Sequence, residues 1–131
     1  MVGLDRNKER GAAIVEFAII LPILLLLVMG IIQFGFIFNG QITLTSAVRE
    51  GARYAVVGNT DADVVKRVED SSLALLMSKP SVTIDRTVNK GESLTVEATS
   101  TVDVIMPLLD IFTGKKVNLS AESTMRIEKS I

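Results

Sequence analysis

The residues with the clearest chemical potential stand at the head of an apolar stretch, where Glu16 follows Gly11 by five positions. A carboxylate at a membrane edge costs on the order of 1–3 kcal/mol, so a partner should offset it. If the chain is cut after Gly11, Ala12 becomes the N-terminus and carries a positive amine. Glu16 then lies one helical turn away and can pair with that amine in its own or a neighbouring chain. The alternative is a partly solvated interfacial acid with no special role.

The element that would position Glu16 is a helix long enough to cross a membrane. Residues 17–38 are almost entirely apolar, with Gln33 as their only strongly polar side chain. These 22 residues would form a helix of about 33 Å, against a hydrocarbon core of about 30 Å. A domain of this size needs no core helix so uniformly apolar. We therefore predict a transmembrane helix over residues 12–40.

The flanks of this segment indicate its orientation. Arg6, Lys8 and Arg10 precede the span and are offset in part by nearby acids. Positive charge near a membrane tends to remain cytoplasmic, which favours an N-terminus inside and a C-terminus outside. Arg49 and Arg53 on the other side weaken the contrast. A secretory leader would carry its cleavage site after the apolar run, whereas here a cut would fall before it.

Proline and glycine within the helix have local consequences. Pro22 removes one backbone hydrogen bond and should bend the axis, which membrane helices tolerate. Gly30, Gly35 and Gly40 are five residues apart. Five residues turn a helix by about 500°, so these glycines do not share a face, and the small-xxx-small packing motif is absent.

Residues 41–58 are predicted to continue the helix outside the membrane, and Gly58 with Asn59 to end it. Glu50 and Arg53 are three residues apart and can pair, for a few tenths of a kcal/mol. Gly51 costs about 1 kcal/mol relative to alanine inside a helix, which a close packing contact would offset. We favour packing of this stalk on its own domain over a direct partner-binding surface.

Residues 59–131 are predicted to form a small α+β domain. Thr60 or Asp61 can cap a second helix with Asp63 in its first turn, and Pro80 follows its end. Its apolar positions are Val64, Val65, Val68, Leu75 and Leu76. Asp61 and Asp63 lack the other ligands of a calcium loop.

The last fifty residues change to a period of two, which is typical of antiparallel strands with one buried face. Strands are predicted to begin near Val82, near Leu94 and near Val117, with a turn at residues 89–91. Three strands alone are marginal, so the second helix or the stalk must cover them. The apolar residues 106–112 are expected to form a short helix that closes the core, or else a patch facing a neighbour.

The composition removes several kinds of chemistry. The chain contains no cysteine and no histidine, which excludes disulfides, thiol chemistry and histidine acid–base catalysis, and leaves no typical zinc ligands. The net charge is −1, so nothing favours a nucleic-acid partner. The acids are scattered along solvated faces rather than converging in a pocket. We therefore expect no enzymatic activity, cofactor or small-molecule substrate.

Two motifs in the N-terminal half resemble the TadE-like pseudopilin family. The first is Gly11, four small or apolar residues and Glu16-Phe17, continued by AIILP and a leucine run. The second is AVREGARYA at residues 47–55, similar to the family's AREGARYA block with Val48 as a departure. It includes Arg49, Glu50, Gly51, Arg53 and Tyr54. The strand end STMRI at residues 123–127 also has the look of the family.

The resemblance implies a minor pseudopilin of a tight-adherence (Flp-type) pilus machine in the bacterial cytoplasmic membrane. Gly11, Ala12, Glu16 and Phe17 would form the recognition site of a prepilin peptidase, with residues 1–11 as leader. The partners implied are that peptidase, other pilins or pseudopilins and the assembly platform. Packing and assembly would involve Glu16, Pro22 and the Arg49–Tyr54 block.

Other functions remain as alternatives. An uncleaved signal-anchor protein could serve as an adaptor in an envelope complex, with Gly11 and Glu16 incidental. The major pilin is disfavoured because major Flp-type subunits are much shorter. A type II secretion pseudopilin is a further relative, but residues 49–55 do not resemble one.

Overall fold

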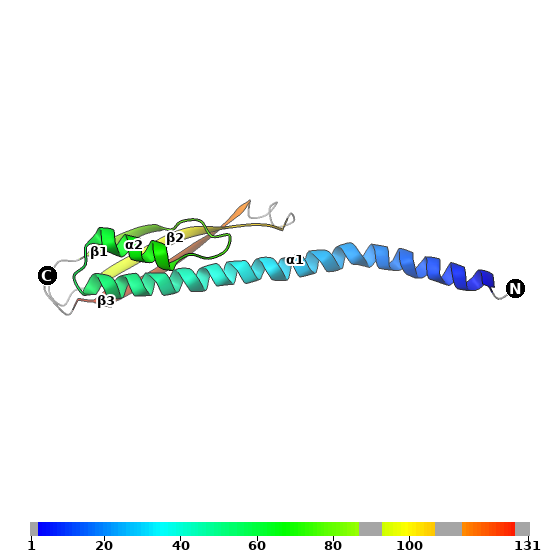
Figure 1. The fold of residues 1–131 in the computed structure, drawn as a ribbon, viewed down its shortest axis with the longest axis horizontal. Coiled ribbons are helices and arrows are strands. Elements are labelled where there is room, and N and C mark those ends of the chain that lie inside the picture. The colour runs from blue at the N-terminus through cyan, green and yellow to red at the C-terminus, as the bar shows by residue number, and fades with distance from the viewer. Residues whose placement is uncertain (1–2, 87–92, 107–113, 128–131) are drawn as a thin grey trace.

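The computed structural model describes residues 3–86, 93–106 and 114–127, with side chains from Arg10 onward. They form two helices and three strands in an α+β arrangement, as predicted. The elements are α1 (Gly3–Val56), α2 (Asp61–Ser71), β1 (Ser81–Arg86), β2 (Ser93–Asp103) and β3 (Lys116–Arg126). Figure 1 shows α1 as a long rod whose C-terminal half carries the other elements, while its N-terminal half extends away from them.

Helix α1 runs without interruption for 54 residues and passes through Pro22. The predicted continuation beyond residue 40 and the predicted stop are both confirmed. Gly58 has a φ of +98°, a conformation that glycine adopts at no steric cost, and its N–H bonds the Ala55 carbonyl at 3.2 Å. The Asn59 amide then donates to the Tyr54 carbonyl at 2.8 Å, so the last turn of the helix is capped from outside.

Helix α2 begins as predicted but is shorter than predicted. The Thr60 hydroxyl accepts from the Asp63 N–H at 3.3 Å, which satisfies a free donor of the first turn. Val64 and Val68 are buried against the core. The helix ends at Ser71 because the Ser72 N–H and hydroxyl both donate to the Glu69 carbonyl.

Assigning Leu75 and Leu76 to this helix was therefore wrong. Leu75 is 67 % exposed, and Leu76 has a φ of +63° in the turn that leads to β1. The segment instead joins the sheet at its edge: the Asp103 N–H bonds the Leu76 carbonyl at 3.0 Å. These backbone bonds, which the apolar spacing does not reveal, decide the conformation here.

The sheet is an antiparallel meander in the order β1-β2-β3. Val96 of β2 lies opposite Ile84 of β1 and Ser123 of β3. The predicted alternation is confirmed, because one face of β2 is buried at five successive alternate positions, Leu94, Val96, Ala98, Ser100 and Val102. The turn predicted at residues 89–91 and most of the apolar segment 106–112 lie outside the described residues.

The buried face of the sheet is covered mainly by α1. Helix α1 contacts β2 and β3, and α2 packs beside α1 towards β1. Leu44, Ala47 and Val48 of α1 share one core with Leu94 and Val96 of β2. The stalk is thus part of the folded domain that the C-terminal half of α1 forms with α2 and the three strands, which is called the outer domain below.

Two glycines let α1 approach its neighbours closely. A Cβ atom on Gly40 would lie 2.9 Å from Leu119 and 3.0 Å from Val102, so the sheet touches the helix backbone there. A Cβ atom on Gly51 would clash with a methyl group of Val68 on α2. The close packing contact expected at Gly51 is therefore present, and it is made within the chain.

We predict that Gly51→Ala lowers the stability of the outer domain. Overpacking against Val68 costs about 1–3 kcal/mol and exceeds the gain of about 1 kcal/mol in helix propensity. Thermal unfolding of the full chain in detergent micelles, followed by circular dichroism, measures the change. Gly35→Ala is the matched control, because nothing lies within 4 Å of its added Cβ. Equal midpoints for the two variants would contradict the packing argument.

Candidate assembly site

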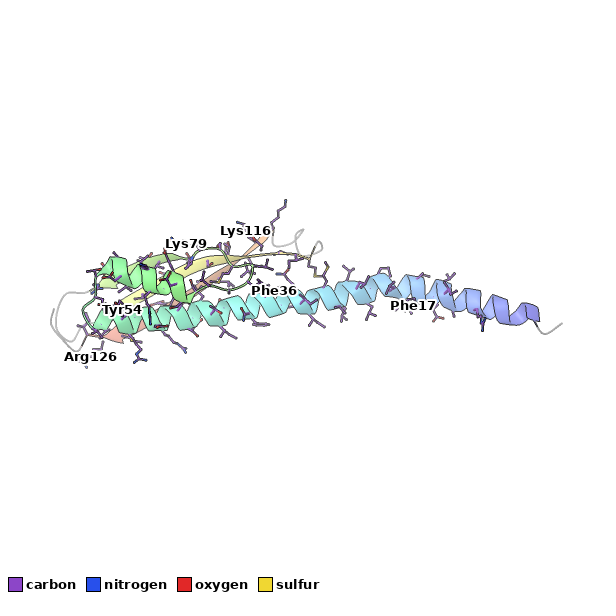
Figure 2. All side chains as sticks on the ribbon, viewed as in Figure 1. Phe17, Phe36, Tyr54, Lys79, Lys116 and Arg126 are labelled. Atoms are coloured by element: carbon purple, nitrogen blue, oxygen red, sulfur yellow. The ribbon has the colours of Figure 1, made fainter. Side chains whose placement is uncertain are left out.

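The N-terminal part of α1 has no covering element among the described residues. The most apolar 18-residue window of the helix has no buried residue, and the helix is long and apolar enough to cross a membrane once. Ile14, Phe17 and Ile23 are each more than 60 % exposed. Figure 2 shows Phe17 far from the sheet, whereas Phe36 lies where the outer domain begins. An apolar surface of this extent requires another apolar environment.

The four residues of the predicted processing site lie on this bare part of the helix. Gly11, Ala12, Glu16 and Phe17 occupy successive turns and are all exposed, and α1 is continuous across the Gly11–Ala12 bond. Among the described side chains, none forms an ion pair with Glu16. Pro22 lies on the same bare stretch. The recognition and pairing roles of these residues remain predictions.

Gln33 joins the bare part of α1 to the outer domain. Its side chain is only 1 % exposed. The Nε2 group donates to the Asp103 carbonyl at 3.2 Å, and Oε1 accepts from the Ile105 N–H at 2.6 Å. Both ends of the amide are therefore satisfied, one by the last residue of β2 and the other by Ile105, two residues after the strand. The sequence showed Gln33 as an isolated polar residue, but nothing in it indicated this partner.

The Arg49–Tyr54 block divides between two sides of α1. Gly51 and Ala52 are buried against the domain, whereas Arg49 and Arg53 are exposed. Successive residues turn by about 100°, which places both arginines opposite the buried side of the helix. One block thus fastens the stalk to its own domain and also presents a cationic outer surface.

Glu50 pairs across to α2 rather than along its own helix. Its Oε1 accepts from Arg67 Nε at 3.0 Å and from Nη2 at 2.5 Å, and its Oε2 accepts from the Ser71 hydroxyl at 3.4 Å. The expected Glu50–Arg53 pair does not occur among the described residues. The packing of α2 along α1 brings Arg67 to the carboxylate, and the sequence spacing could not reveal this. Both groups are about half exposed, so the pair contributes about 1 kcal/mol or less.

An open groove lies beside this ion pair on the outer side of the helices. Three guanidinium groups and one carboxylate border it together with the Tyr54 ring. Its lining is Ser46, Arg49, Glu50, Arg53, Tyr54, Val57 and Arg67. Tyr54 is 39 % exposed and Val57 is 78 % exposed. Tyrosine and arginine are among the residue types enriched at energetically important positions of protein interfaces.

The two aspartates that sequence analysis considered for calcium have partners within the chain. Asp61 pairs with Arg86 of β1, and the Asp63 carboxylate accepts from the Thr60 hydroxyl at 2.6 Å. In the described part of the chain, no group of three acids, histidines or cysteines is placed to hold a metal ion. The arrangement serves packing: Arg86 also donates to the Asn59 carbonyl and so ties β1 to the loop before α2.

We predict that Gln33→Leu loosens the end of β2. The Ile105 N–H and the Asp103 carbonyl would lose this partner while partly buried, at a cost of about 1–3 kcal/mol. Hydrogen exchange at the Ile105 amide should therefore accelerate, while exchange at Val96 stays slow. Gln41→Leu is the control, because the bond from Gln41 to the Ser120 carbonyl is exposed and water can replace it. Unchanged exchange at Ile105 would show that the amide does not hold the strand.

Comparison with known proteins gives one match. Residues 11–53 match the family model described as TadE-like protein, which confirms the family resemblance over the apolar helix and the arginine block. This is a structural family associated with tight-adherence (Tad) pili and is not known for enzymatic activity. No curated protein and no solved structure matches the chain.

Proposed function

From a chain whose residues 11–53 carry the TadE-like pattern, we propose a minor pseudopilin that takes part in the assembly of a tight-adherence pilus. It is a non-catalytic structural subunit. The observation that carries the proposal is the bare apolar half of α1 with Glu16 at its head, fused without a break to a small outer domain. Such a helix can be stored in a bilayer and later pack against the helices of other subunits.

The proposed placement in the membrane follows from where the outer domain begins. Gln33 and Gly40 are already covered by β2 and β3, so the lipid-exposed part is the stretch below them. Residues 12–31 form about 30 Å of helix, which matches the hydrocarbon core. This span is narrower than residues 12–40 and seats the outer domain directly on the membrane surface. The N-terminus is cytoplasmic and the domain is extracytoplasmic.

Processing by a prepilin peptidase after Gly11 gives Glu16 its role. Removal of residues 1–11 creates a positive amine on Ala12 about one turn from the carboxylate. The ion pair, within a chain or between neighbours, then offsets the cost of a carboxylate near the bilayer and fixes the axial register of adjacent helices. Glu16 is exposed, and no element in the described part of the chain covers it, which supports this proposal.

We predict that the protein recovered from the membranes of its own host begins at Ala12. Intact mass and N-terminal sequencing measure this directly. Gly11→Leu should leave the chain at full length, because the bulky side chain blocks the site. Gly35→Ala, outside the site, should be processed normally. A mature chain that still begins at Met1 in a host with the peptidase would instead favour the uncleaved signal-anchor adaptor.

A substitution at Glu16 should separate processing from assembly. Glu16→Ala should still be cleaved after Gly11 but should lower the yield of surface pili at least tenfold, because the amine of Ala12 loses its partner. Glu16→Asp keeps the charge and should retain part of the yield. Pili are counted by electron microscopy and sheared-fraction immunoblots. Normal pilus yield from the alanine strain would contradict the assembly role of this acid.

A further inference from the structure

The outer face of the sheet is acidic at its centre. Glu97 of β2 lies directly opposite Glu122 of β3, and both are exposed. Asp85 of β1 is on the same face, opposite Thr95. Like charges directly opposite each other in a sheet destabilise it. The cations described on this face lie at its ends, Arg126 near one end and Lys116 opposite Asp103 at the other.

The outer side of α1 carries the opposite charge. Arg49 and Arg53 are exposed beside the groove, and Tyr54 and Val57 add partly exposed apolar surface. Glu50 on this side is already paired with Arg67. Because α1 covers the buried face of the sheet, this cationic side and the acidic sheet face are the two opposite outer surfaces of the domain.

The two surfaces lie at nearly the same height along α1. The bond from Gln41 to the Ser120 carbonyl, 2.9 Å long, sets the level of β3 against the helix. With about 3.3 Å per strand residue, Glu122 and Asp85 stand about 7 and 13 Å above that level. With about 1.5 Å per helix residue, Arg49 and Arg53 stand about 12 and 18 Å above it. On average the two arginines therefore stand about 8 Å above Glu97 and Glu122, which lie at one level, and about 2 Å above Asp85.

We propose that the groove formed by Arg49, Arg53 and Tyr54 binds the Glu97–Glu122 face of a second copy of this chain. Two copies anchored side by side in one membrane, with the same orientation, need an axial offset of about 8 Å to bring the two arginines level with the two glutamates. The arginines of one copy then neutralise the opposed glutamates of the next. The inference goes beyond the proposed function and rests on its shared anchoring in one membrane.

The contact is heterologous, because the arginine groove of one copy binds the acidic sheet face of the next. Such a contact leaves a free surface at both ends, so copies related by a small rotation and an axial offset extend as an open helical array. Complementary charge also steers the encounter of copies and sets their register. The acidic face and the arginine side together therefore allow one copy to bind the next.

Crosslinking between introduced cysteines tests the contact. The chain has no native cysteine, so only the introduced ones react. Two differently tagged full-length copies are expressed in the host membrane, one with Val57→Cys beside the groove and one with Thr124→Cys on the sheet face. A bismaleimide with a span of about 10 Å should join them severalfold above the collision level. The collision level is measured with a second copy that carries Leu73→Cys in place of Thr124→Cys. Leu73 is 85 % exposed and lies outside the proposed contact.

Charge reversal gives the second arm. Arg49→Glu with Arg53→Glu in the Val57→Cys copy should reduce crosslinking to the collision level. Adding Glu97→Lys with Glu122→Lys to the Thr124→Cys copy should restore it. Circular dichroism confirms that each variant folds. Crosslinking at the collision level, crosslinking insensitive to the reversals, or preferential capture of a different protein would overturn the proposal. Intact mass from the same membranes shows separately whether processing at Ala12 has occurred.

Discussion

The structure depends on removing one very long apolar helix surface from water. Helix α1 is 54 residues long, and nothing in the described chain covers its first half. The sheet and α2 cover its second half. Burial of apolar surface is the dominant favourable term in folding and membrane insertion alike, so the same helix unites a membrane segment and a domain core. The position along α1 where the bare apolar surface ends and the sheet begins to cover the helix therefore determines how much of the helix belongs to the domain.

Gln33 lies at that position. An amide inside an apolar run would be costly if it faced lipid, and here both of its ends are bonded to the end of β2. A few turns later, Gly40 lets Leu119 and Val102 rest on the helix backbone. Together these residues hold the sheet against α1 from Gln33 onward. The outer domain therefore begins inside the segment that hydropathy alone assigns to the membrane.

The arginine block shows how one sequence motif serves two surfaces. Its small residues, Gly51 and Ala52, face α2 and the core, while its charged residues face outward. Packing within the chain and recognition between chains are therefore compatible explanations of the same residues. The exposed arginines of the block lie on the outer side of α1, and Glu97 and Glu122 lie at the centre of the exposed sheet face.

The sequence by itself determined the elements that local periodicity and local chemistry specify. The long apolar run, the helix stop at Gly58, the cap at Thr60 and the alternation in β2 and β3 each depend on neighbouring residues. Only the tertiary structure decided contacts between distant residues: Gln33 with β2, Glu50 with Arg67, Gly40 with the sheet, and Leu76 with Asp103. These depend on how far apart the packed elements lie and at what height they meet. Spacing along the chain does not contain that information.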